Sequence, residues 1–112
     1  MRLLKKEEHD LIVYLLRNNP NFESFLQELP SLTVEEMNDG GMGSLRFLYK
    51  DGKKSIFKDE VAIINIRDMV GVSVRYALNM DMEGNIYELD VFKGDFSKLK
   101  KFPTPPYDSM RR

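Results

Sequence analysis

The sequence predicts an α+β domain in which two N-terminal helices pack on one face of a roughly five-stranded antiparallel meander sheet. Two observations predict this class: apolar residues recur every three or four positions up to residue 30, and they alternate with polar residues beyond it. With 112 residues, the chain is long enough for one core without metal or disulfide support. We expect a single domain over residues 1–103 and an extended, mobile tail over residues 104–112, which contains two prolines.

The first helix is predicted over residues 6–17. Glu7 and Glu8 in its first turn and Arg17 in its last turn suit the helix dipole. His9, the single histidine, falls on the polar side by spacing, which favours a surface histidine over a general base. The apolar residues would form one face of the helix: Leu4, Leu11, Ile12, Leu15 and Leu16.

The second helix is predicted between Asn19 and Pro30. Asn19 followed by Pro20 is typical of an N-cap and the first helical position, and Pro30 stops the helix. A helix this short and one-sided is stable only against a large apolar surface, for which the sheet is the obvious candidate. Its bulky apolar residues are Phe22, Phe25, Leu26 and Leu29.

After residue 30 the chain is predicted to form strands joined by turns at Asp51-Gly52 and at residues 68–71. Charged residues in the middle of the third strand, over residues 58–60, predict a bend or bulge there. After the last strand, residues 96–102 would fold back as a short helical turn or a covering loop. The predicted strands are residues 32–38, 44–49, 55–66, 72–80 and 86–92.

The last hairpin has the clearest alternation. The register that buries both apolar rows places Tyr76, Leu78 and Met80 opposite Val91, Leu89 and Tyr87, with a two-residue loop at Glu83-Gly84. The same register puts four polar residues on the opposite face, with Asn79 across from Glu88 and Arg75 diagonal to Asp90.

These four residues form the first candidate site. Glu88 and Asp90 lie two positions apart on one strand, close enough to raise one another's pKa or to share a cation, and Arg75 could then orient a substrate. The plainer interpretation is a solvent-facing surface with cross-strand ion pairs, because antiparallel sheets commonly leave one face wet.

The second candidate site is the glycine turn, residues 37–44, which joins the first two predicted strands. Gly40, Gly41 and Gly43 beside Asp39 indicate a backbone that requires positive φ. Such a loop can bind an anion or let a partner's backbone come close, or it can be a plain hairpin connection. The candidate binding residues here are Glu36, Asp39, Gly40, Gly41 and Met42, the last as an exposed anchor.

Composition excludes several functions. Seventeen Lys and Arg against eighteen Asp and Glu give a net charge of −1, without the basic stripe of a nucleic-acid binder. Because the chain has no cysteine, disulfides, thiolate nucleophiles and sulfur-based zinc sites are absent. No apolar run is long enough to span a membrane, and the N-terminus lacks a signal-peptide pattern. We expect a cytoplasmic protein without a cofactor.

Two segments, Glu36-Met37-Asn38-Asp39-Gly40-Gly41-Met42-Gly43-Ser44-Leu45 and Glu88-Leu89-Asp90-Val91-Phe92-Lys93-Gly94-Asp95-Phe96, resemble a family of small bacterial proteins known only as a domain of unknown function. The resemblance covers nearly the whole chain. It implies a bacterial source but no catalytic or binding residues. Members of such families sometimes lie among toxin-immunity genes.

These observations favour a non-catalytic module that binds a protein partner through the glycine turn and the neighbouring acids, in an immunity-like role. If Glu88 and Asp90 meet in space with the second acidic group, Glu35, Glu36 and Asp39 beside the glycine turn, the two groups would form one anionic patch that suits a basic partner. An alternative is a small acid–base or metal-dependent enzyme that uses Glu88, Asp90 and Arg75. A third hypothesis is a homodimer formed through the open edges of the sheet.

Overall fold

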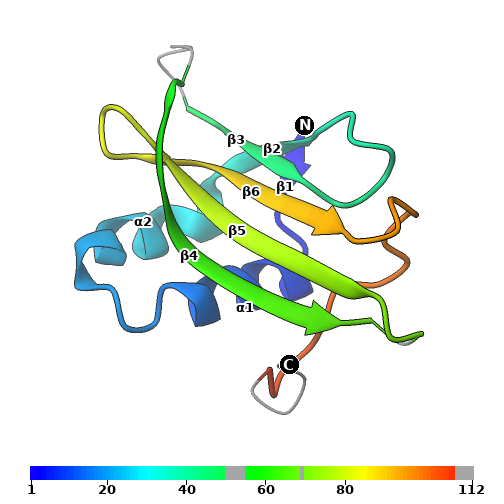
Figure 1. The fold of residues 1–112 in the computed structure, drawn as a ribbon. Helices are drawn as coiled ribbons and strands as arrows, with labels where there is room; N and C mark the ends of the chain where they lie inside the picture. Colours follow the sequence, from blue (N-terminus) through cyan, green and yellow to red (C-terminus); the bar gives the residue numbers. More distant parts are fainter. Residues whose placement is uncertain (50–54, 69, 108–112) are drawn as a thin grey trace.

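The chain folds into two helices and a six-stranded sheet in a computed structural model that describes residues 1–49, 55–68 and 70–107 (Figure 1). Short 3₁₀ turns at Pro20–Phe22 and Leu29–Ser31 flank the second helix. The elements are β1 (Arg2–Leu3), α1 (Lys6–Leu15), α2 (Glu23–Glu28), β2 (Thr33–Glu36), β3 (Leu45–Leu48), β4 (Phe57–Arg67), β5 (Ser73–Asp81) and β6 (Ile86–Lys93).

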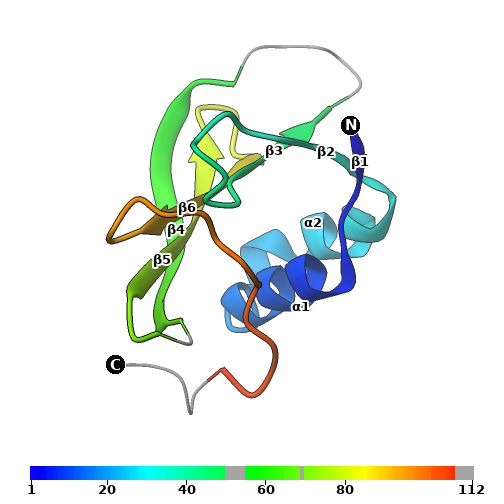
Figure 2. The same ribbon diagram turned by 90° about the vertical axis from the view of Figure 1, so that its right-hand side faces the viewer.

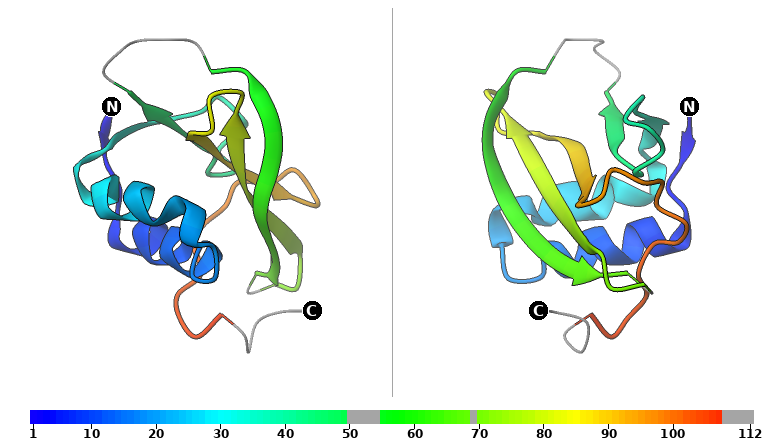
Figure 3. Two further views of the ribbon diagram at one scale, coloured as in Figure 1. Left: turned by 90° about the vertical axis from the view of Figure 1, so that its left-hand side faces the viewer. Right: turned by 45° about the vertical axis from the view of Figure 1, so that its right-hand side comes forward.

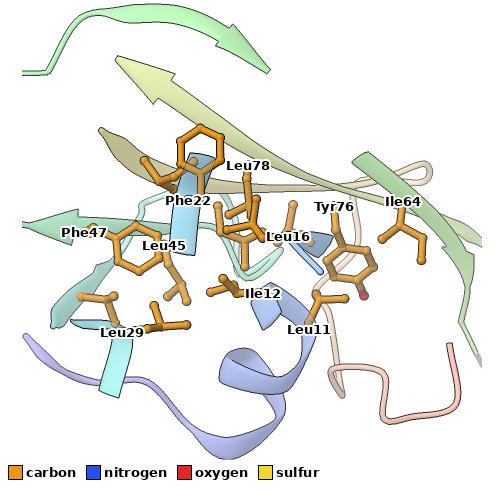
Figure 4. Close-up of a cluster of buried hydrophobic side chains, with 14 of the residues drawn as sticks. Leu11, Ile12, Leu16, Phe22, Leu29, Leu45, Phe47, Ile64, Tyr76 and Leu78 are labelled. Atoms are coloured by element: carbon orange, nitrogen blue, oxygen red, sulfur yellow. The ribbon is translucent and has the colours of Figure 1, made fainter. Parts of the chain in front are cut away.

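Both helices lie on one side of the sheet, as Figures 2 and 3 show, and the predicted α+β class is confirmed. Leu11 and Ile12 of α1 and its C-cap residue Leu16 are buried and point toward the sheet (Figure 4). They meet Tyr76 and Leu78 of β5, so the helical period of α1 and the alternation of β5 produce one shared core. We call the uncovered side of the sheet the open face.

The strand order is β1-β2-β3-β6-β5-β4, with every neighbouring pair antiparallel. The predicted meander is therefore wrong in its order, because β3 pairs with β6 and β4 lies at the far edge. The sheet also gains β1 as an extra strand of two residues. Pairing β3 with β6 places Leu45 opposite Leu89, which continues the buried apolar row across the sheet. The predicted turn at residues 51–52 lies outside the described residues.

The last hairpin follows the predicted register over most of its length. Tyr76 pairs with Val91, Leu78 with Leu89, and Asn79 with Glu88. Beyond Asn79 a bulge makes Met80 pair with Ile86, so the expected pairing of Met80 with Tyr87 is wrong.

The loop of this hairpin is also longer than predicted, because β5 ends at Asp81 and β6 begins at Ile86. The buried carboxylate of Asp81 accepts hydrogen bonds from the N–H groups of Glu83 and Asn85, both at 3.0 Å. Asp81 thus satisfies the donors of a four-residue turn that contains Gly84. In β4, register shifts at Phe57/Asp59 and Glu60/Ala62 confirm the predicted irregularity.

After β6 the C-terminal segment, residues 94–107, runs without regular secondary structure from the sheet toward α1 (Figure 2). It forms the covering loop that was one of the two expectations for residues 96–102. Tyr107 is buried, and its ring lies 4.7 Å from that of Tyr14 on α1. Residues 108–112 lie outside the described residues, so the predicted mobile tail stays a prediction. In the described part of the chain, neither helix is long and apolar enough to cross a bilayer.

Candidate functional site

The residues predicted from sequence lie at two neighbouring places. Arg75, Asn79, Glu88 and Asp90 converge on the open face, on β5 and β6. The second group, Glu36, Asp39 and Gly41, lines a cavity of about 320 Å³ at the edge of the sheet.

In the glycine turn, Asp39 organises the backbone. Its carboxylate accepts hydrogen bonds from the N–H of Met42 at 3.1 Å and from the N–H of Ser44 at 3.0 Å. Burial acts to raise the pKa of Asp39, but the Ser44 side chain and these backbone hydrogen bonds outweigh it, so the pKa lies below its ordinary value. Asp39 is therefore ionised and already occupied by its own turn.

The glycines of this turn receive the C-terminal segment. The Leu99 N–H donates to the Gly41 carbonyl at 3.0 Å. Gly43 has a φ of +105°, and a Cβ there would lie 3.2 Å from side-chain atoms of Leu99 and Phe102. The backbone that comes close to the turn thus belongs to the same chain, and a small residue is required for that contact.

Met42 does not form the exposed anchor that was predicted. It is half-buried, and its sulfur accepts the N–H of Lys93 at 3.4 Å. Gly40 is exposed, and a Cβ there would meet nothing within 4 Å, so its positive φ of 77° is its only observed requirement.

On the open face, Glu88 is held between two neighbouring strands. Its carboxylate accepts the Asn79 side-chain amide at 3.1 Å and lies 3.4 Å from Arg46 of β3. The cross-strand position of Asn79 was predicted. Arg46 was missed, because nothing in the alternation of β3 indicates that its neighbour is β6.

Arg75 pairs with a different carboxylate from the one considered from sequence. Its guanidinium lies 2.7 Å from Glu60 of β4, and both oxygens of Glu60 accept from the same nitrogen. The predicted diagonal placement toward Asp90 is present in the register, since Arg75 pairs with Phe92 and Ala77 with Asp90. The charged residues 58–60, which predicted a bulge in β4, include Glu60, the ion-pair partner of Arg75.

Asp90 is the carboxylate of this face whose pKa lies above its ordinary value. Burial raises it most; the nearby charge of Arg75 lowers it, while the negative charges of Glu60 and Asp39 raise it further. Within the described residues, no cation lies within salt-bridge distance of Asp90. The charge of Asp39, one of the acids beside the glycine turn, also acts on Asp90.

Ser44 lies between these groups. Its hydroxyl accepts the Val91 N–H at 2.9 Å and donates to the Val91 carbonyl at 3.2 Å, which extends the pairing of β3 with β6 by a side chain. The same side chain acts on the carboxylates of Asp39 and Asp90 and lowers the pKa of each. Ser44 is thus a shared neighbour of the two sites that the sequence analysis had not assigned.

Exposed apolar side chains occur among the open-face charges. Phe92 on β6 is 42% exposed and Ile63 on β4 is 43% exposed; their strand partners, Arg75 and Ala77, lie on the same face. Phe92 packs edge-on against Phe96, with ring centroids 5.2 Å apart. This combination of acids with exposed apolar groups gives the face a mixed chemistry.

Three other observations bear on the chemistry of the site. Across the described ranges, no group of three or more His, Cys, Asp and Glu residues is placed to hold a metal ion. His9 lies on α1, 3.7 Å from Asp10, as expected of a surface histidine. Among side chains in the described ranges, the Asn79 Oδ1 is buried without a hydrogen-bond partner.

The N-terminal edge holds a separate ion network. Arg2 of β1 donates to Glu8 at 2.8 and 2.9 Å and to Glu36 at 3.2 Å. The Lys5 N–H also donates to Glu8 at 2.8 Å, so Glu8 caps the start of α1, for which the sequence offered no usual N-cap residue. Glu36, a predicted binding residue, is therefore engaged within the domain.

The fold and these surfaces define a small α+β domain with one helical layer, one sheet and a charged open face. A family model, described as a domain of unknown function (DUF6984), matches residues 1–103, and the chain belongs to that family. No curated protein and no solved structure matches the chain.

Proposed function

We propose that this domain is a non-catalytic protein-interaction module that binds a basic partner surface through the open face of its sheet. The observation that carries the proposal is Asp90, a half-buried carboxylate beside the exposed ring of Phe92, on a face that no helix covers (Figure 3). Burial raises the pKa of Asp90 most, and the negative charges of Glu60 and Asp39 raise it further. These same negative charges would attract a cation brought by a partner. Phe92 and Ile63 supply the apolar contact that such an interface requires.

An immunity-like inhibitor is one form of this proposal. Such a module covers a basic surface of its target, and a target that binds an anionic substrate offers a surface of this kind. The resemblance noted from sequence would make the host a bacterium, and its lysate is the natural source of the partner.

The test is affinity capture from that lysate, followed by titration of the purified partner against three variants. Asp90→Lys and Phe92→Ala should each weaken binding by about tenfold or more, because a reversed charge and a lost aromatic contact act at the centre of the surface. Glu23→Lys, an exposed charge reversal on α2, is the matched control and should bind as the wild type does. The proposal fails if no partner is recovered, or if all three variants bind it equally.

The enzyme hypothesis retains one supporting observation, the raised pKa of Asp90, which an acid–base group would need. Its metal-dependent form lacks a ligand set among the described residues. Calorimetric titration with Mg²⁺, Mn²⁺ and Ca²⁺, repeated on Glu88→Gln, separates the two hypotheses, because a protein interface is indifferent to metal. Light scattering over a range of concentrations tests the homodimer, for which β4 offers the long sheet edge.

A further inference from the structure

A second cavity, of about 530 Å³, lies on the helical side of the sheet, where the C-terminal segment crosses the ends of β4 and β6. Its volume falls in the range of small-molecule sites. The inner wall is apolar: Ile66 and Tyr76 are buried residues of the sheet, and the Tyr76 ring lies 5.8 Å from that of Phe102. We call this space the C-terminal cavity.

A buried lysine contributes to the same wall. Lys93, the last residue of β6, has only 5% of its side chain exposed. Its ammonium group lies 2.8 Å from Asp68 and donates to the Lys98 carbonyl at 3.3 Å. A lysine ammonium has three donors, so among the described residues one N–H of Lys93 has no partner.

The charges around the C-terminal cavity are unbalanced. In the described part of its lining, two carboxylates, Asp68 and Asp95, face an excess of cations. This excess occurs in a chain whose net charge is −1, so the positive charge is a local feature. The cations are Arg67, Lys93, Lys100 and Lys101.

The neighbouring cavity of about 320 Å³ provides a contrast, since it shares Leu99, Lys100, Lys101 and Phe102 as a common wall. Its described lining has as many carboxylates as cations: Glu7, Glu8, Glu36 and Asp39 against Arg2, Lys5, Lys100 and Lys101. Arg2 there is fully engaged with Glu8 and Glu36. The balanced charges of the smaller cavity do not favour an anion, whereas the excess of cations in the C-terminal cavity does.

We propose that the C-terminal cavity binds a small organic anion with an apolar body, the chemistry shared by a medium-chain carboxylate and an alkyl phosphate monoester. The apolar part would lie against Ile66, Tyr76 and Phe102, where transfer from water is favourable. The anionic group would face the buried ammonium group of Lys93 and the exposed side chains of Arg67 and Lys100, where charge-assisted hydrogen bonds are available. This site is separate from the open face and does not depend on the function proposed for it.

The experiment is a titration of the ¹⁵N-labelled full chain with octanoate, octyl phosphate, octanol and octylammonium. Binding is measured by the chemical shifts of the backbone amides in NMR spectra and by calorimetry. Saturable changes in amide chemical shift are expected at Arg67, Lys93 and Leu99 with both anions. The anion that binds with the higher affinity identifies the preferred headgroup. Octanol should bind at least about tenfold more weakly than the anions, because it lacks the negative charge.

Variants locate the effect. The pair Lys93→Met with Asp68→Asn removes the buried ion pair as a unit and should weaken anion binding about tenfold without changing octanol binding. Arg67→Gln, on the exposed rim, tests the same point without disturbing the interior. Lys5→Gln removes a cation that lines only the smaller cavity and is the matched control.

The outcomes are unambiguous. Equal affinity for octanol and the anions would overturn the proposal, as would shifts confined to Lys5 and Glu36. Unchanged anion binding in both Arg67→Gln and the double variant would do the same, and well-dispersed amide spectra would confirm that the variants are folded.

Discussion

Two carboxylates of this domain, Glu8 at the N-terminal edge and Asp90 on the open face, are both withdrawn from water, but their pKa values are shifted in opposite directions. Burial acts to raise the pKa of each. At Glu8, hydrogen bonds from Arg2 and from the Lys5 N–H outweigh burial, and the pKa is lowered. At Asp90, the charge of Arg75 does not outweigh burial and the two neighbouring acids, and the pKa is raised.

The difference separates a structural carboxylate from an available one. Glu8 joins β1 to α1, and its carboxylate oxygens already accept hydrogen bonds from Arg2 and from the Lys5 N–H, so a ligand would gain little by binding there. Arg75 is bound to Glu60, so Asp90 keeps surplus negative charge. The three experiments below test this comparison, beginning with the largest expected effect.

Glu8→Gln should lower the free energy of unfolding at pH 7 by roughly 2–3 kcal/mol, because it removes one partner of a buried ion pair. Since the folded pKa of Glu8 is lowered, its stabilisation is present above the ordinary glutamate pKa and is lost as the pH falls through the folded value. Urea unfolding at several pH values measures both effects. Glu7→Gln is the matched control, and an equal loss in it would contradict the structural role of Glu8.

Asp90→Asn should have the opposite sign and raise the free energy of unfolding at pH 7 by roughly 0.5–1 kcal/mol. The folded pKa of Asp90 is raised, so its contribution to stability is present below the ordinary aspartate pKa and is lost as the pH rises through the folded value. The gain over the wild type should therefore disappear at acidic pH. A variant less stable than the wild type at pH 7 would show that the ionised form of Asp90 is required by the fold.

Asp39→Asn should have the smallest effect, a fall in the pKa of Asp90, because one of the charges that raises this pKa is removed. Carbon-13 titration of the side-chain carboxyl groups by NMR measures this change. Glu35→Gln, which removes an exposed carboxylate of β2, is the control. Equal shifts in the two variants would mean that Asp39 and Asp90 are not specific neighbours.

Some of the candidate site could be predicted from the chain because it depends on neighbours within one hairpin. The pairing of Asn79 with Glu88 follows from the two-residue period of β5 and β6. The partners from other strands, Glu60 and Arg46, could not be predicted, since alternation fixes which face a residue occupies but not which strand lies next to it. The same limit explains why Met42 was assigned to the surface when it packs against Lys93.

By itself the sequence determined the class of the fold, because the spacing of apolar residues shows the helical and the alternating period directly. It also identified the glycine turn as a segment whose backbone requires positive φ. Only the tertiary structure decided that β3 pairs with β6, that the turn receives Leu99 and Phe102, and that Asp39 acts on Asp90. The physical reason is range: local periodicity depends on residues a few positions apart, whereas these contacts join segments about 50 residues apart whose proximity is set by packing the whole core.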